Sequence, residues 1–280
     1  TDSQNLFGGY EFSKTMAQSG IQPIIGASVF LKDKNGDGEV ALLAQNEIGY
    51  KNLCKLMSDA WMQCDGMEKP KILVSEFLEL SKGLIVLTGS PKDGFISKVL
   101  LQSQAIALAR LQMLSDNLEG RVYLELQRHG LQQEYYVEER LLEFSDQLKL
   151  PLIATNDCYF ENEEMFVPQK ILTCIATNQR LASMTIYNQS AHHRFKTAHE
   201  MEELFIDIPE AISNSLLIAK RCAFMIQDRE PILPEYIDPE GRTPEQVLCI
   251  QAEQGLTQRL EALEKLGKLE FHKQDYVKRL

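Results

Sequence analysis

The chain has 280 residues, of which 44% are apolar and 25% charged, and this composition predicts a folded protein with at least one large core rather than a disordered one. Twenty-nine Lys and Arg against 40 Asp and Glu give a formal net charge of −11, which opposes broad binding to a phosphate backbone through long-range attraction. No apolar run approaches the roughly 18 residues that a membrane span needs, so no membrane contact is expected.

Strand-like and helix-like segments alternate along the first part of the chain. The predicted strands cover 21–30, 39–44, 83–90, 122–127 and a last stretch that begins at 152 and stops at Asn156 and Asp157. Three helical stretches are predicted. The first starts with Asn46 as N-cap, the second has helical spacing of apolar residues over 99–114, and the third covers 134–148. This order favours βαβ units and a mainly parallel sheet, either open or closed into a barrel.

The pattern changes after Asp157. Residues 161–175 have helical spacing, 183–197 look irregular, and two short helices follow, the second with Pro209 in its first turn. Four prolines between 231 and 244 then mark a boundary before one long helix over 245–266. We therefore expect a first domain over 1–228, a Pro-rich linker over 229–244 and a helical segment over 245–280.

The six cysteines are scattered singly, without the paired spacing of zinc sites or the dense pattern of small secreted domains. They predict reduced, mostly buried thiols in a cytoplasmic protein. The chain opens on TDSQNLFGGYEF without Met or a signal-peptide pattern, so we expect that its N-terminus is trimmed.

Polar residues just beyond the predicted strands are the first candidates for a functional site, because α/β folds place their chemistry at the carboxyl ends of strands. Asp157 ends one strand and His129 follows another. A turn or cap role for Asp157 and a hydrogen-bonded loop position for His129 are the commoner alternatives. The remaining histidines show no convergent partners in the sequence; they are His192, His193, His199 and His272.

The loop over 33–39 partly imitates a calcium-binding EF-hand. Its twelfth place is Ala44, which cannot supply the bidentate carboxylate, so a polar hairpin turn is the better interpretation. No GxSxG, P-loop, GxGxxG or HExxH motif occurs in the chain. Composition and periodicity alone therefore indicate a cytoplasmic α/β domain with an undefined site.

Seven stretches recur in the order and spacing of one known family. They are TDSQNLFGGYEF, GIQPIIGASVF, ALLAQNEIGYKNLCKLMS, GLIVLTGS, YLELQRHG, LPLIATND and EMEELFIDIPEAISNSLLIAKRC. Together they resemble the PHP (polymerase and histidinol phosphatase) domain of bacterial DNA polymerase III alpha subunits. LPEYIDPEGRTPEQ and the helix after it resemble the passage into the polymerase palm. The resemblance implies a distorted (β/α)7 barrel that lacks its first strand here, followed by a helical start of the polymerase module.

Metal-bearing members of that family hold three metal ions at the carboxyl ends of the strands with His, Asp, Glu and sometimes Cys. By this resemblance, Ser3 and Tyr159 stand where the family has histidines, and Ser28 stands for a glutamate. Glu39 replaces another histidine, Ser90 replaces a cysteine, Asp157 is kept, and His129 matches an LQxHG pattern. Serine and tyrosine hydroxyls are poor metal ligands at neutral pH. We therefore expect no bound metal at these vestigial positions: Ser3, Ser28, Glu39, Ser90, His129, Asp157 and Tyr159.

The resemblance implies that the parent protein is a DNA-directed DNA polymerase, a nucleotidyltransferase of DNA replication that uses Mg²⁺. The chain ends before the catalytic aspartates of the palm, so we expect no catalytic residue and no cofactor in this fragment. Its expected role is a cytoplasmic scaffold for the proofreading exonuclease (epsilon) subunit, while the sliding clamp, the clamp loader and DNA contact later domains.

Two alternatives stay open. One is an active, metal-dependent PHP phosphoesterase or 3′–5′ exonuclease, which the substitutions oppose. The other is a PHP phosphatase unrelated to replication, such as the histidinol-phosphate kind, which the resemblance to a palm entrance opposes.

Overall fold

The computed structural model describes residues 1–66, 68–181, 190–232, 234, 236–268 and 272–280. The chain divides into two compact units, Thr1–Gln227 and Asp228–Leu280, and each is described by itself. Much of the stretch predicted to be irregular, 183–197, lies outside the described residues; within its remainder, Ala191–His193 forms one turn of 3₁₀ helix.

A mixed seven-stranded sheet lies at the centre of the first unit. Its strands are β1 (Asp2–Ser3), β2 (Gly26–Asp33), β3 (Gly36–Ala44), β4 (Lys71–Leu73), β5 (Leu84–Leu87), β6 (Val122–Leu126) and β7 (Leu152–Ala154). The order is β1-β2-β3-β5-β6-β7, and β4 also pairs with β2. The β2–β3 and β3–β5 pairs are antiparallel and the other four are parallel. The predicted α/β class with a mainly parallel sheet is thus confirmed.

The β2–β3 hairpin turns at Lys34 and Asn35, where the Asp33 carboxylate accepts a hydrogen bond from the Asn35 amide at 2.7 Å. The predicted hairpin is therefore correct, but the predicted strand over 21–30 begins only at Gly26. Pro23 lacks a backbone N–H to donate, and pairing with β3 starts at Gly26.

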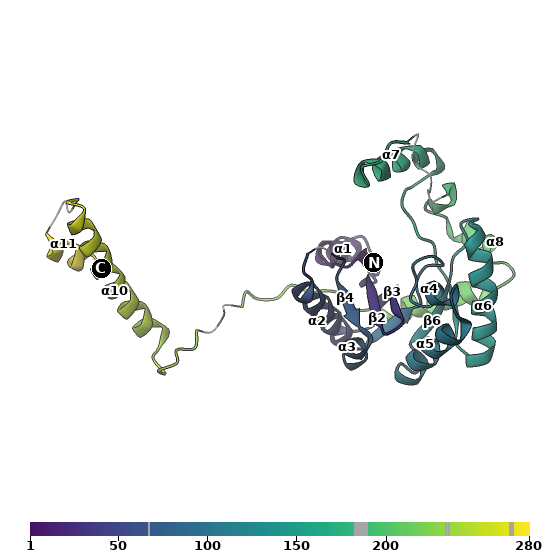
Figure 1. Ribbon diagram of the computed structural model, residues 1–280, viewed down its shortest axis with the longest axis horizontal. Helices are drawn as coiled ribbons and strands as arrows, with labels where there is room; N and C mark the ends of the chain where they lie inside the picture. Colours follow the sequence, from purple (N-terminus) through teal and green to yellow (C-terminus); the bar gives the residue numbers. More distant parts are fainter. Residues whose placement is uncertain (67, 182–189, 233, 235, 269–271) are drawn as a thin grey trace. The chain divides into compact units, whose positions relative to one another are not determined.

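Nine α-helices accompany the sheet among the described residues of the first unit. They are α1 (Gly9–Gln18), α2 (Glu47–Gln63), α3 (Val74–Glu79), α4 (Ser97–Leu100), α5 (Gln104–Asn117), α6 (Gln132–Leu148), α7 (Phe166–Ala176), α8 (Ala198–Leu204) and α9 (Pro209–Arg221). Figure 1 shows α2 and α3 beside β2 and β4. As predicted, Asn46 caps α2, its side chain accepting from the Gly49 amide at 3.0 Å. The single helix expected over 99–114 is instead two helices, α4 and α5.

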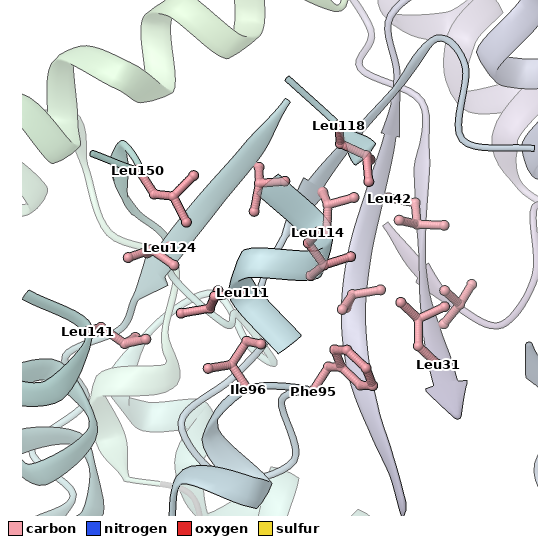
Figure 2. Packing of buried hydrophobic residues seen from close by; sticks show 14 of the residues in the cluster. Leu31, Leu42, Phe95, Ile96, Leu111, Leu114, Leu118, Leu124, Leu141 and Leu150 are labelled. Atoms are coloured by element: carbon pink, nitrogen blue, oxygen red, sulfur yellow. The ribbon is translucent and has the colours of Figure 1, made fainter. Parts of the chain in front are cut away.

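Alternate strand residues face two different cores. The larger core contains Leu84 and Val86 of β5, and Figure 2 shows part of it, where Leu111 and Leu114 of α5 gather with Leu42 of β3. A smaller core lies on the other sheet face and joins strand residues to α9 through Ile85, Leu87, Tyr123, Ile153, Ile218 and Cys222. Since side chains alternate along a strand, Glu125 lies on the same face as Tyr123, and Glu39 on the same face as Leu43.

The second unit contains α10 (Pro244–Lys265) and α11 (Lys273–Arg279). Thr243 and Gln246 form a capping box at the start of α10, and Val247 and Leu260 are the buried residues of the helix. The long helix predicted over 245–266 is confirmed. In both units, the described residues include no helix with the length and apolarity that crossing a bilayer requires.

All six cysteines are free thiols, but the prediction that most are buried is wrong. Only Cys174 and Cys222 are buried, while Cys158 and Cys249 are exposed and the other two are half-buried. Cys158 follows β7 at the edge of the sheet and Cys249 lies on an exposed side of α10.

Candidate functional site

A cavity of about 570 Å³ opens where β5, β6 and β7 end. Six of the seven positions predicted from the sequence line it: Ser28, Glu39, Ser90, His129, Asp157 and Tyr159. The seventh, Ser3, lines an adjoining hollow that shares Ser28, Glu39, Asp157 and Tyr159 with the cavity. The structure therefore brings the predicted positions together at one edge of the sheet.

Strand direction explains this convergence. β5, β6 and β7 run parallel, so the residues after them meet at their carboxyl ends, while β3 runs antiparallel to β5 and contributes Glu39 from its first half. Ser3 and Ser28 are direct partners across β1 and β2.

The segment after β5 closes the cavity beside β3. The Phe95 amide donates to the Glu39 carbonyl at 2.8 Å, and the Glu39 amide donates to the Asp93 carbonyl at 2.7 Å. A Cβ atom at Gly38 would lie only 2.4 Å from the Phe95 Cα, so only glycine permits this close approach.

Glu125 of β6 is a site residue that the sequence analysis missed. Its buried carboxyl group accepts from the Gly89 amide at 3.0 Å, the Thr155 hydroxyl at 2.6 Å and the Gln127 side-chain amide at 3.0 Å. Burial raises the pKa of Glu125 despite these donors. The available signal was an acidic residue inside the otherwise apolar strand VYLEL.

Replacing Glu125 with Gln avoids the cost of burying a charge but turns an amide NH2 toward one of the donors that Glu125 accepts from, so the change in stability should depend on pH. A raised folded-state pKa means that the wild type loses stability as pH rises through it, so the variant should compare better with the wild type at pH 8 than at pH 5. Urea unfolding at both pH values measures the effect, with the exposed Glu79→Gln as control. A difference in stability between Glu125→Gln and wild type that is the same at both pH values would contradict this.

His129 is buried and hydrogen-bonded through both ring nitrogens. Nδ1 lies 2.9 Å from Glu134 Oε1 and Nε2 lies 3.1 Å from Asn156 Oδ1. Asn156 is oriented by its own contacts, since its Nδ2 donates to the Arg194 carbonyl and its Oδ1 accepts from Lys196 Nζ at 2.8 Å. Both ring nitrogens therefore face side-chain oxygen atoms, so neither is free for another ligand.

Glu134 is likewise buried and engaged. Burial raises the pKa of Glu134. Hydrogen bonds from the His129 ring and from the backbone amides of Leu131 and His129 lower this pKa by more, so the net shift is downward. The interpretation of His129 as a hydrogen-bonded loop histidine is confirmed.

His193 stacks on His129, with ring centroids 3.9 Å apart and planes at 15°. This stacking was not predicted, because His193 and His129 lie in segments that are distant in the sequence. Burial, together with the neighbouring His129, lowers the pKa of His193 to about 4, so the His193 ring is neutral at pH 7. The Ser190 amide donates to His193 Nδ1 at 3.0 Å.

This depressed pKa predicts a specific loss of stability in acid. The unfolded chain takes up a proton on His193 near pH 6.5 and the folded protein only near pH 4, so stability should fall by about 2–3 kcal/mol as pH drops through that window. Urea unfolding of the wild type and of His193→Gln across pH 4 to 6.5 measures this. The variant should show a shallower decline, and parallel curves would refute the assignment.

Glu39 and Asp157 are two carboxyl groups that line the cavity and accept no hydrogen bond from any described residue, whereas the Asp93 carboxylate pairs with Lys92 Nζ at 3.7 Å. Burial raises the pKa of Glu39, and the negative charges of Asp157 and Asp93 raise it further. Asp157 is half-buried and makes none of the cap contacts that its position in the sequence suggested. Ser90 serves a turn, since its hydroxyl accepts from the Asp93 amide at 3.1 Å.

The donors needed for a metal cluster are mostly engaged or replaced. Both His129 nitrogens and both Glu125 oxygens already have partners. Within the described parts of the chain, no group of three or more His, Cys, Asp or Glu residues converges as a metal ion requires. These residues therefore do not fit a multinuclear metal site.

Comparison with known proteins adds the family. The family model of the PHP domain matches residues 1–129. The chain carries a PHP domain. Ser3, Ser28, Glu39, Ser90 and His129 lie within the matched residues of this PHP domain, whereas Asp157 and Tyr159 lie beyond them in the same compact unit.

Similar full-length proteins extend this match to the whole chain. The chain is 36% identical to DNA polymerase III subunit alpha of Caulobacter vibrioides, over 100% of the chain and 25% of that relative. It is 32% identical to the same subunit of Rickettsia conorii, over 99% and 24%, and 35% identical to that of Vibrio cholerae, over 94% and 23%. The PHP domain and the residues after it thus match the N-terminal region of these relatives and span about a quarter of their length.

One similar solved structure is a putative metal-dependent phosphoesterase from Bifidobacterium adolescentis. It is 13% identical, with a TM-score of 0.37, and the match covers 56% of this chain and 74% of that one.

Proposed function

We propose that this chain is the N-terminal region of a replicative DNA-directed DNA polymerase of the polymerase III alpha type, and that its PHP site is a metal-free scaffold. Relatives named DNA polymerase III subunit alpha, aligned over 94–100% of the chain, support the first part. Nucleotide transfer with Mg²⁺, and contacts with DNA, the sliding clamp and the clamp loader, belong to the later domains of the cytoplasmic full-length protein.

The arrangement of the full-length protein follows from this proposal. The PHP domain occupies 1–228 and completes a distorted (β/α)7 barrel with a strand from upstream residues, and a Pro-rich linker over 229–244 leads to the helical start of the polymerase module over 245–280. The boundary between the two compact units, which lies between Gln227 and Asp228 in the sequence, supports this division.

The engagement of donor atoms at the cavity is the observation that carries the scaffold proposal. Ser3, Ser28, Ser90 and Tyr159 offer hydroxyl groups, and His129 binds Glu134 and Asn156 instead of presenting a free nitrogen. A metal cluster needs several deprotonated N or O donors at once, and its second shell must orient rather than occupy them. We propose that the folded surface of this domain instead docks the proofreading exonuclease subunit.

Two assays of purified proteins test the proposal. The full-length protein should extend a primed template with Mg²⁺, and the chain of residues 1–280 should bind the C-terminal segment of the exonuclease subunit in a calorimeter. Absence of primer extension would refute the polymerase assignment, and absence of heat of binding would refute the docking role.

The second candidate function is a metal-dependent phosphoesterase or 3′–5′ exonuclease. The observation in its favour is that Glu39 and Asp157 face the cavity without donors among the described residues, as ligands would. If this activity exists, residues 1–280 should release labelled nucleotide from single-stranded DNA with added Mn²⁺ or Zn²⁺, and Asp157→Asn should abolish the release. We expect no release from either protein.

A further inference from the structure

Helix α7 exposes apolar side chains along most of its length. Val167, Leu172 and Ile175 are 56%, 59% and 71% exposed, and Ile171 is 45% exposed. Only Cys174 of this helix is buried. In Figure 1, α7 stands apart from the helices that lie against the sheet. A helix with so many apolar positions is ordinarily packed inside a protein.

One contact of α7 with the rest of its unit lies at the start of the helix. The Phe166 ring at its start lies 6.0 Å from Phe160, which is buried next to the end of β7. Val167, Ile171, Leu172 and Ile175 stay exposed, whereas Cys174 is buried. Contiguous exposed apolar surface of this kind marks a place where another polypeptide segment packs.

The size of the surface limits what can cover it. Four apolar side chains on an 11-residue helix offer on the order of a few hundred Å², well below the roughly 800 Å² per partner that a stable interface between separate chains buries. A segment of the same polypeptide needs less area, because its packing is intramolecular and does not carry the full entropic cost of bringing two separate chains together. This favours an occupant from the same chain over a second copy or a separate protein.

The relatives indicate where such a segment lies. The aligned region occupies 22–25% of their length and is N-terminal, so most of their polypeptide follows it. We infer that, in the full-length protein, a segment C-terminal to residue 280 packs on the apolar face of α7, formed by Val167, Ile171, Leu172 and Ile175. This inference rests on the proposed function, which supplies the longer chain.

Hydrogen exchange tests the inference directly. Amides of Phe166–Ala176 should exchange about tenfold or more slowly in the full-length protein than in residues 1–280, because the covered helix opens less often. Peptides from β6 serve as internal controls and should exchange equally in both. Equal exchange of α7 in the two proteins, or protection in residues 1–280 that grows with protein concentration, would overturn the inference, the latter by pointing to a second copy.

A pair of matched variants provides a second readout. Leu172→Glu places a charge on the α7 face, and Leu216→Glu does so on α9, where the leucine is also 59% exposed. Leu172→Glu should lower the melting temperature of the full-length protein but not that of residues 1–280, and Leu216→Glu should change neither. Equal shifts for the two variants in the full-length protein would count against α7 as the covered surface.

The two proposals fail in different ways. A full-length protein that extends primers but leaves α7 unprotected defeats only this inference. A full-length protein without polymerase activity defeats the proposed function, whatever the exchange of α7.

Discussion

Replacing Arg110 with Met is expected to lower the free energy of unfolding by about 3–5 kcal/mol, because it breaks a buried ion pair from one side. The Arg110 side chain is only 2% exposed. Its Nε and Nη2 bind the Asp33 carboxylate at 2.9 and 2.6 Å, and Nη2 also donates to the Gly36 carbonyl at 3.0 Å. A methionine would leave Asp33 with only its backbone donor from Asn35 and would remove the guanidinium donor of the Gly36 carbonyl.

This cluster supports the wall of the cavity. The guanidinium also donates to the Phe95 carbonyl and lies 3.9 Å from the centre of the Phe95 ring. Phe95 in turn donates to the backbone of Glu39. The Arg110 guanidinium thereby ties α5 to the β2–β3 turn and to the segment that closes the cavity beside β3.

Urea unfolding at pH 7 measures the loss, with Arg140→Met as matched control. Arg140 pairs with Glu143, which is 54% exposed, and such pairs contribute less than about 1 kcal/mol. The double variant Asp33→Asn/Arg110→Met should be more stable than Arg110→Met alone, since it removes the unpaired charge. Equal losses in the free energy of unfolding for the Arg110 and Arg140 variants would show that the buried ion pair contributes no more to stability than the exposed one.

Replacing His129 with Phe should destabilise the protein by about 2–4 kcal/mol. Phenylalanine preserves the ring that stacks on His193 but provides no N–H for Glu134 or Asn156. Glu134 would keep only its backbone donors from His129 and Leu131, although it is just 5% exposed. The cost is therefore that of a buried carboxylate that has lost its side-chain donor.

Thermal or urea unfolding compares this variant with His199→Phe, whose side chain is 78% exposed and which should be nearly neutral. Adding Glu134→Gln to His129→Phe should recover part of the loss, because the unpaired charge disappears. If His129→Phe is as stable as wild type, the Glu134–His129–Asn156 chain does not hold the site together.

Much of the fold follows from local signals. Alternating apolar runs located β3, β5, β6 and β7, the Asn46 cap located the start of α2, and a proline run separated α10 from the first unit. Short elements such as α1, α3 and β4 escaped prediction because they depend on tertiary packing more than on their own periodicity.

The site was predicted in part. Resemblance to a known family singled out seven positions, and six of them line one cavity in the structure. Glu125 and His193 were missed, for different reasons. Glu125 was missed because its strand was interpreted as uniformly apolar and buried. The stacking of His193 on His129 joins segments more than 60 residues apart, and no local sequence pattern encodes such a contact.

We propose that the described residues of the cavity offer too few unengaged ligands for a metal cluster and that hydrogen bonds hold its walls instead. Elemental analysis tests this most directly: residues 1–280, and the full-length protein beside them, are incubated with Zn²⁺, Mn²⁺ or Fe²⁺, freed of unbound metal by gel filtration and measured by mass spectrometry. We expect far less than one bound metal ion per chain, and we expect Asp157→Asn to leave this metal content unchanged. One or more ions per chain, lost in Asp157→Asn or Glu39→Gln, would contradict it.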